Sequence, residues 1–213
     1  MAKTKILISS AFLVVLLLPA CIGGMDKYGA KIKRMHADQI TIDAILPANA
    51  PSISQQYHRL PKGNINEQRK EHLGIDITAA KGTAVIAPAN GVVSASYFEP
   101  FYGNTVEVDH GRDAAGRQLH TIYKHLADRK VQSGDRLVRG QEIGGLGRTG
   151  ALSSGILHLH FEVLREDEKG KLTQVDPSLY WADGVGRVTC FAKSKHWPDK
   201  PFKTTYPVIC KAL

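Results

Sequence analysis

The chain has 213 residues, which is enough for one domain with a buried core and short appendages. Its hydrophobic content of 43% and charged content of 23% are typical of a globular protein. The formal net charge of +8 would attract polyanions, but no basic run is interleaved with aromatic residues and no nucleic-acid-binding motif appears. Nucleic acid is therefore not an expected partner.

The first 20 residues have the composition of a secretion signal. Lys3 and Lys5 form a positive start, and residues 6–18 are apolar apart from two serines. A helix of this length spans only about 20 Å, short of the ~30 Å hydrocarbon core, so a permanent membrane span is not expected. The run ends in Leu18-Pro19-Ala20-Cys21, which resembles the lipobox of bacterial lipoproteins. The resemblance implies a signal peptide over residues 1–20 and a lipid on Cys21.

Lipidation of Cys21 would attach the mature chain to a membrane; the alternative is an ordinary cleaved signal with a coincidental cysteine. Ile22, and not an aspartate, follows the cysteine. In Gram-negative sorting this favours the outer membrane, facing the periplasm and the cell wall. Residues 21–45 are polar and basic with little periodicity, and we interpret them as a tether.

Residues 46–188 show the pattern of short strands cut by glycine-bearing turns. No segment keeps a 3.6-residue apolar stripe over eleven or more positions, so long helices are not expected. The prediction is an all-β domain built on a small antiparallel sheet. The expected strands, rich in β-branched and aromatic residues, are 84–86, 92–97, 105–108, 119–126 and 157–164.

Two histidine-bearing segments could carry chemistry. In a strand, alternate residues share a face, so His158, His160 and Glu162 would lie on one face. Leu159 and Phe161 would lie on the opposite, apolar face. Taken alone, a pair of histidines at this spacing is more often a pair of surface residues than a metal site.

The other segment is His72-Leu73-Gly74-Ile75-Asp76. In a straight strand, His72 and Asp76 would be about 13 Å apart, too far to bind one metal. A helix is disfavoured by Gly74 and by the β-branched residues that follow. We expect a bend at Gly74, with a positive φ that folds both side chains toward one point. The alternative is a surface histidine and a turn aspartate.

Taken together, the two segments supply imidazoles and a carboxylate, a ligand set suited to zinc. Three protein ligands plus water would make a catalytic site, whereas His72, Asp76, His158 and His160 together could close a structural one. The residues alone leave both arrangements open. The helical His-Glu-x-x-His motif of common zinc proteases is absent.

The C-terminal segment, residues 189–213, changes composition toward Lys, Pro and Cys, and we interpret it as an irregular tail. With Cys21 assigned to a lipid, Cys190 and Cys210 remain as a pair. In an oxidising compartment their disulfide would close a loop of about 20 residues, worth roughly 3 kcal/mol. The alternative is two free thiols. The remaining histidines show no supporting spacing and are expected at the surface or behind the site: His36, His58, His110, His120 and His196.

Three motifs carry a resemblance to a known family: His72-x-Gly74-x-Asp76, Tyr123-Lys124-His125-Leu126 and His158-x-His160. Their order and spacing resemble those of the M23 peptidases, the lysostaphin and LytM-like family. Connecting segments are similar as well, including Gly103-Asn104-Thr105-Val106. The resemblance covers roughly residues 70–165. Upstream of His72 the chain departs from the family, because a polar insertion ending at Glu71 takes the place of a short Gly-Arg turn.

The resemblance implies an antiparallel domain of the M23 type, the duplicated hybrid motif, with an open groove that holds Zn²⁺. By analogy, His72, Asp76 and His160 would be the ligands. His158 and His125 would flank the activated water without binding the metal. We assign His158 as the base and His125 as the orienting or stabilising group, although the residues leave the reverse assignment open.

The implied function is that of a zinc-dependent endopeptidase that hydrolyses peptide cross-links of bacterial peptidoglycan. A D,D-cross-link is the first expectation, and a glycyl bridge remains open. The alternative is a non-enzymatic wall-binding regulator that activates an amidase, although such members usually lack a zinc ligand and none is missing here. A secreted zinc protease acting on ordinary proteins is a third hypothesis.

Overall fold

The computed structural model describes residues 42–58 and 72–212. The predicted signal peptide, the lipidation site Cys21, the tether up to residue 41 and the insertion over residues 59–71 lie outside the described residues. In the part of the chain that is described, no helix has the length and apolar character needed to cross a membrane.

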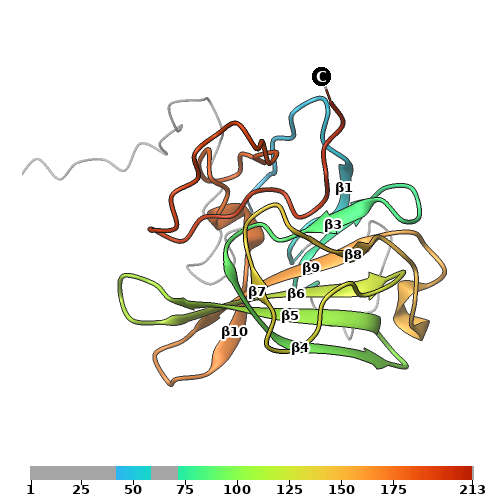
Figure 1. The fold of residues 1–213 in the computed structure, drawn as a ribbon, viewed down its shortest axis with the longest axis horizontal. Helices are drawn as coiled ribbons and strands as arrows, with labels where there is room; N and C mark the ends of the chain where they lie inside the picture. Colours follow the sequence, from blue (N-terminus) through green and yellow to red (C-terminus); the bar gives the residue numbers. More distant parts are fainter. Residues whose placement is uncertain (1–41, 59–71, 213) are drawn as a thin grey trace, which may run out of the picture. The chain divides into compact units, whose positions relative to one another are not determined.

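The domain is built on one eight-stranded sheet and one two-stranded sheet, all antiparallel (Figure 1). The larger sheet has the order β1-β2-β9-β6-β5-β4-β7, with β10 also paired to β9, and the smaller pairs β3 with β8. Two 3-10 turns, η1 (Ala151–Ser153) and η2 (Pro177–Leu179), are the only helical segments in the described ranges. The all-β prediction is confirmed. The strands are β1 (Ser52–Gln55), β2 (Ile75–Thr78), β3 (Ala84–Ile86), β4 (Gly91–Glu99), β5 (Gly103–Arg112), β6 (Gln118–Leu126), β7 (Arg136–Leu137), β8 (Glu142–Gly145), β9 (Leu159–Glu166) and β10 (Leu172–Val175).

Strand β9 lies inside the larger sheet, between β2 and β6, and shows the predicted alternation. Leu159, Phe161 and Val163 are fully buried in the core. They pack with the inward residues of the neighbouring strands, among them Ile75 of β2 and Tyr123 of β6. The opposite face of β9 therefore carries the polar residues at the even positions.

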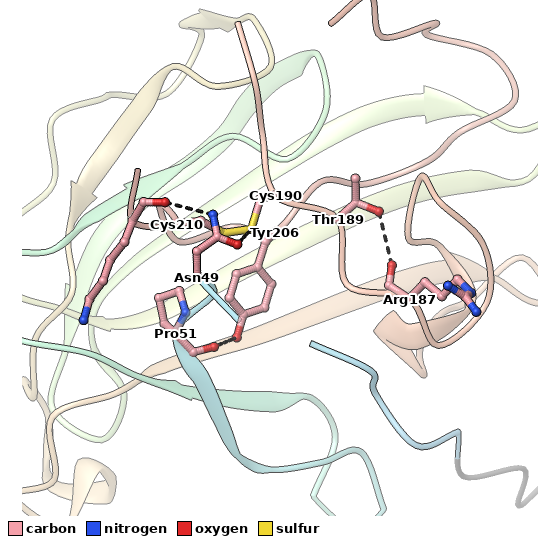
Figure 2. The surroundings of a disulfide bond; sticks show 8 residues. Asn49, Pro51, Arg187, Thr189, Cys190, Tyr206 and Cys210 are labelled. Carbon is pink, nitrogen blue, oxygen red and sulfur yellow. Dashed lines mark hydrogen bonds between the residues drawn. A yellow bond between two sulfur atoms is a disulfide. The ribbon is translucent and has the colours of Figure 1, made fainter. Parts of the chain in front are cut away.

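The C-terminal segment completes the core and is not merely appended to it. Tyr206 and Val208 are almost fully buried in the same core as the sheet. The Tyr206 hydroxyl donates to the Pro51 carbonyl over 2.9 Å, next to a disulfide between Cys190 and Cys210 (Figure 2). The Cα atoms of the two cysteines are 5.9 Å apart. The sequence predicted this cross-link, but no pattern in it indicated that residues inside the loop enter the core.

The residues before β1 also join the folded domain. The Ile45 backbone pairs with residues 186 and 188, over 2.7 and 3.0 Å. The Ile42 amide donates to the Asp176 carboxylate over 3.2 Å. The end of the segment interpreted as a tether is thus part of the domain from residue 42 onward.

Candidate metal centre

One row of residues crosses three strands on the polar face of the sheet. Asp76 of β2 is paired with His160 of β9, and His160 is paired with Lys124 of β6. Neighbouring strands are about 4.8 Å apart, so directly paired side chains lie close together on the same face. The sheet register thus brings a carboxylate, an imidazole and an ammonium group side by side.

Three potential metal-binding atoms converge at one end of this row. The Nδ1 atom of His160 lies 2.8 Å from Oδ1 of Asp76, and Nε2 of His72 lies 3.1 Å from each of these atoms. The side chains are only 12 to 16% exposed. The structure therefore brings together the three residues that the resemblance implied as ligands.

Gly74 allows His72 and Asp76 to point at the same place, but not in the way that the sequence predicted. A bend is present at Gly74, directly before β2. The expected positive φ is wrong, because Gly74 is not among the residues with positive φ. Glycine is needed instead for space: a Cβ atom there would lie 2.5 Å from the Phe161 carbonyl oxygen and 3.0 Å from Nε2 of His160.

The hydrogen-bond partners fix which ring nitrogens carry hydrogen. Nδ1 of His72 lies 3.0 Å from the Gln56 carbonyl oxygen, and Nε2 of His160 lies 3.0 Å from Oε1 of Glu162. A carbonyl and a carboxylate can only accept, so each of these nitrogens is the donor. When the rings are neutral, Nε2 of His72 and Nδ1 of His160 are then left as lone pairs that face the Asp76 carboxylate.

Three acceptors that meet at about 3 Å repel one another unless a proton or a metal cation lies among them. A donor set of two imidazole nitrogens and one carboxylate oxygen is one of the ligand sets found in catalytic zinc sites. Each imidazole is also held from behind through its second nitrogen, as is usual for metal-binding histidines. The residues therefore fit a bound zinc ion.

The electrostatics of the cluster favour a charged carboxylate. Burial opposes the charge on Asp76, but the adjacent His160 and His72 rings, which donate to Asp76 when they are protonated, outweigh burial and hold the pKa of Asp76 well below its usual range. Burial also opposes a charge on Glu162, yet its bond to His160 and the charge of Lys124 lower the pKa of Glu162 to about 2. Both carboxylates are thus ionised at neutral pH.

His125 and His158 lie beside the three converging residues. Their rings are 4.8 Å apart, and the ring of His125 is 6.4 Å from that of His160. Nδ1 of His125 donates to the Thr149 carbonyl over 2.8 Å, and Nδ1 of His158 donates to the Ile156 carbonyl over 3.0 Å. Both histidines therefore keep a lone pair on Nε2, and that of His158 lies 3.9 Å from Asp76 Oδ1.

Strand β6 presents His125 through an irregularity near its end. The pairing with β5 shifts between Asn104 and Val106, and His125 adopts a left-handed φ of 63°. A bulge of this kind redirects a side chain, and such strained residues are frequent at functional sites. Burial lowers the pKa of His125 to about 4 despite the bond to Thr149, so its ring is neutral at neutral pH.

Within residues 42–58 and 72–212, the other histidines do not join this centre. His110 is bonded to the Asn90 carbonyl and to the Thr121 hydroxyl, at 2.7 and 2.8 Å. His120 lies 3.8 Å from Asp109. His196 is exposed, and His36 lies outside the described residues.

Two residues that support the centre were missed from the sequence. Glu162 was assigned to the polar face of its strand without a role, and Lys124 was noted only as part of a motif. Their side chains form an ion pair across β9 and β6. The alternation of β9 already places Glu162 on the face of the histidines, but only the strand pairing identifies Lys124 as its partner.

Comparison with known proteins places this geometry in a family. The family model of peptidase family M23 matches residues 70–177. The chain is 32% identical over 155 residues to the peptidoglycan DD-endopeptidase ShyC of Vibrio cholerae, which covers 72% of this chain and 34% of that relative. It is 40% identical over 92 residues to the DD-carboxypeptidase/endopeptidase Mpg of Neisseria meningitidis, covering 43% of this chain and 19% of the relative.

The fold is also found among solved structures. A zinc containing peptidase from Vibrio cholerae superposes with a TM-score of 0.50 at 24% identity, over 70% of this chain and 44% of the other. The chain spans about a third or less of the length of the two curated relatives named above. The family match covers half of the chain. It includes the three converging residues His72, Asp76 and His160 and the two neighbouring histidines, His125 and His158. This chain belongs to peptidase family M23.

Proposed function

We propose that this protein is a zinc-dependent endopeptidase that hydrolyses peptide cross-links of bacterial peptidoglycan. The observation that carries the proposal is the convergence of three lone-pair atoms from His72, Asp76 and His160. The relatives support the substrate class, since ShyC is named a peptidoglycan DD-endopeptidase and Mpg a DD-carboxypeptidase/endopeptidase.

The ligands in this proposal are Nε2 of His72, Oδ1 of Asp76 and Nδ1 of His160, which lie close enough to share one ion. A bound zinc supplies Lewis acidity, which polarises the scissile carbonyl and makes water a better nucleophile at neutral pH. The carboxylate of Asp76 would partly offset the charge of the metal ion. The two neutral imidazoles would bind the ion without adding charge.

His158 is the proposed general base. With Nδ1 held by the Ile156 carbonyl, its Nε2 lone pair is directed toward Asp76 and can take a proton from the attacking water. The same nitrogen then delivers that proton to the amine that leaves. Burial lowers the pKa of His125, which makes this ring a weaker base than an ordinary imidazole and disfavours His125 as the group that takes the proton.

His125 is the proposed orienting group. Its Nδ1–H is occupied by the Thr149 carbonyl, so its free Nε2 can accept a hydrogen bond but not donate one while the ring is neutral. Such an acceptor can hold one hydrogen of the attacking water and so direct the oxygen lone pair toward the carbonyl. A role as oxyanion donor would require a protonated ring, which burial disfavours.

The proposal is tested on purified muropeptide dimers of two kinds, D,D-cross-linked and glycyl-bridged. Zinc-loaded protein should convert the D,D-cross-linked dimer into monomers with a new free amine, detected by mass spectrometry. Asp76→Asn should give no product. If neither dimer is cleaved by protein of verified zinc content, the endopeptidase proposal fails.

We further propose that the chain is exported and held at a membrane, facing the cell wall, by a lipid on Cys21. The apolar segment before Cys21 and its lipobox-like ending support this. In cells, the wild type should fractionate with membranes and carry a mass increment on its N-terminal peptide. Cys21→Ser should appear in the soluble fraction, and retention of that variant on membranes would contradict the lipid anchor.

A further inference from the structure

We propose that the ion pair of Lys124 and Glu162 is a positioning device that sets the ring orientation of His160 and presents its Nδ1 atom to the metal. This inference rests on the proposed function, because it assigns a positioning role to two side chains that support a proposed zinc ligand. Neither residue was assigned a role by the family resemblance.

The Glu162 carboxylate is almost completely enclosed by donors. Glu162 is only 2% exposed, and its Oε1 atom accepts from Nε2 of His160 over 3.0 Å and from the Lys124 ammonium. Its Oε2 atom accepts from the Gln174 side chain over 3.2 Å. A carboxylate held from three sides has little freedom to rotate, so it can fix the ring that bonds to it.

Lys124 is itself held in place and not free to swing into solvent. Its side chain is 14% exposed, and Nζ lies 4.1 Å from the centre of the Tyr102 ring. A buried carboxylate without a counter-ion is strongly disfavoured, so Lys124 keeps Glu162 charged and in its acceptor position. Because the pair is neutral as a whole, it supports His160 without adding net charge beside the metal.

Gly74 packs closely against the hydrogen-bonded side chains of His160 and Glu162. A Cβ atom at Gly74 would lie 3.0 Å from Nε2 of His160 and 3.1 Å from Cγ of Glu162. The chain thus passes directly over the bond between the two side chains. The acceptor for Nε2 of His160 is thus the Glu162 carboxylate, and the packing of Gly74 against both side chains favours one orientation of the ring.

The test measures zinc affinity by chelator competition in Glu162→Gln and in the double variant Lys124→Met/Glu162→Gln. The neutral amide is a weaker acceptor, so Glu162→Gln should lower zinc affinity about 10- to 100-fold. The double variant leaves no buried charge unpaired, so it should melt near the wild-type temperature and still bind zinc weakly. This separates positioning from a purely structural role.

The matched control is the exposed pair of Lys130 and Glu142, whose side chains are 48% and 41% exposed. Glu142→Gln and Lys130→Met/Glu142→Gln make the same chemical change away from the cluster and should leave zinc affinity unchanged. The inference is overturned if Glu162→Gln and its double variant bind zinc as tightly as these controls.

A second readout does not depend on zinc. In the metal-free protein, the Nε2–H proton of His160 should exchange slowly with water in NMR spectra, and faster in Glu162→Gln. Equal exchange rates would contradict the positioning role. A wild-type protein that binds no zinc would instead contradict the proposed function, so the two failures are distinguishable.

Discussion

The Nδ1 atom of His160 lies 2.8 Å from Oδ1 of Asp76, although the two residues are 84 positions apart. They are direct partners on the neighbouring strands β9 and β2. A slip of one residue in this pairing would turn Asp76 to the core face and bring an isoleucine beside His160. The sheet register, fixed by Ile75 and Ile77 in the core, is thus the physical basis of the centre.

The two histidines beside the cluster should be needed for catalysis but not for metal binding. His158→Ala should keep its zinc and lose peptidase activity by roughly 10²- to 10⁴-fold, because proton transfer to the leaving amine is lost. His125→Ala should also keep zinc and lose activity. The measurements are zinc content and cleavage rate of a cross-linked muropeptide, with the exposed His196→Ala as control. Loss of zinc from either variant would show that the residue is a ligand.

Gly74→Ala should weaken both the fold and the metal site. The added methyl group would lie 2.5 Å from the Phe161 carbonyl oxygen, so β2 must move away from β9. We expect a loss of roughly 1 to 3 kcal/mol in unfolding free energy, and weaker zinc binding. Gly116→Ala is the control, because a Cβ there meets nothing within 4 Å and only its positive φ is strained. Unaltered zinc affinity in Gly74→Ala would argue against this packing role.

His110 should make the stability of the domain depend on pH. Burial lowers the pKa of His110 from 6.5 to about 4, with the Asn90 carbonyl and Asp109 opposing the shift and His120 and Arg139 adding to it. The unfolded chain takes up the proton below pH 6.5 while the folded one does not. Stability from this group is therefore complete above pH 6.5 and is lost as the pH falls toward 4, by an amount of the order of 2 kcal/mol.

Urea unfolding of wild type and His110→Asn between pH 4 and 7.5 measures this effect. The difference in unfolding free energy between the two proteins should shrink as the pH falls. A difference that is constant over this range would contradict the neutral state of His110.

The disulfide between Cys190 and Cys210 should contribute to the stability of the domain without taking part in the candidate metal centre. It closes a loop of 20 residues, so the variant Cys190→Ser/Cys210→Ser should lose roughly 3 kcal/mol in unfolding free energy. Because Tyr206 and Val208 follow within that loop and enter the core, the loss should appear as a lower melting temperature of the whole domain. An unchanged melting temperature under reducing conditions would contradict this.

Much of the fold follows from local sequence patterns. The alternation of Leu159, Phe161 and Val163 against His158 and His160 predicts both a strand and its two faces, and the buried core confirms it. The five expected strands correspond to β3, β4, β5, β6 and β9, with ends that differ by up to four residues, whereas β1, β2, β7, β8 and β10 were not expected. These features depend on residues close in sequence, so a single chain reveals them.

The features that could not be predicted depend on partners far along the chain. The ion pair of Lys124 and Glu162 exists only because β6 and β9 are neighbours. The bulge that directs His125 depends on the shift against β5, which has no signature in β6 itself. Burial of Tyr206 was missed because its segment has no strand periodicity, and its space is created by residues from elsewhere in the domain.

The most direct test of this account is the zinc content of purified protein after dialysis at neutral pH, combined with X-ray absorption at the zinc edge. The account predicts one zinc per chain, bound by two imidazole nitrogens and a carboxylate oxygen. Asp76→Ala and His160→Ala should bind zinc far more weakly. A wild-type protein that retains no zinc, or an Asp76→Ala variant with the wild-type spectrum, would contradict the claim that these side chains form a metal centre.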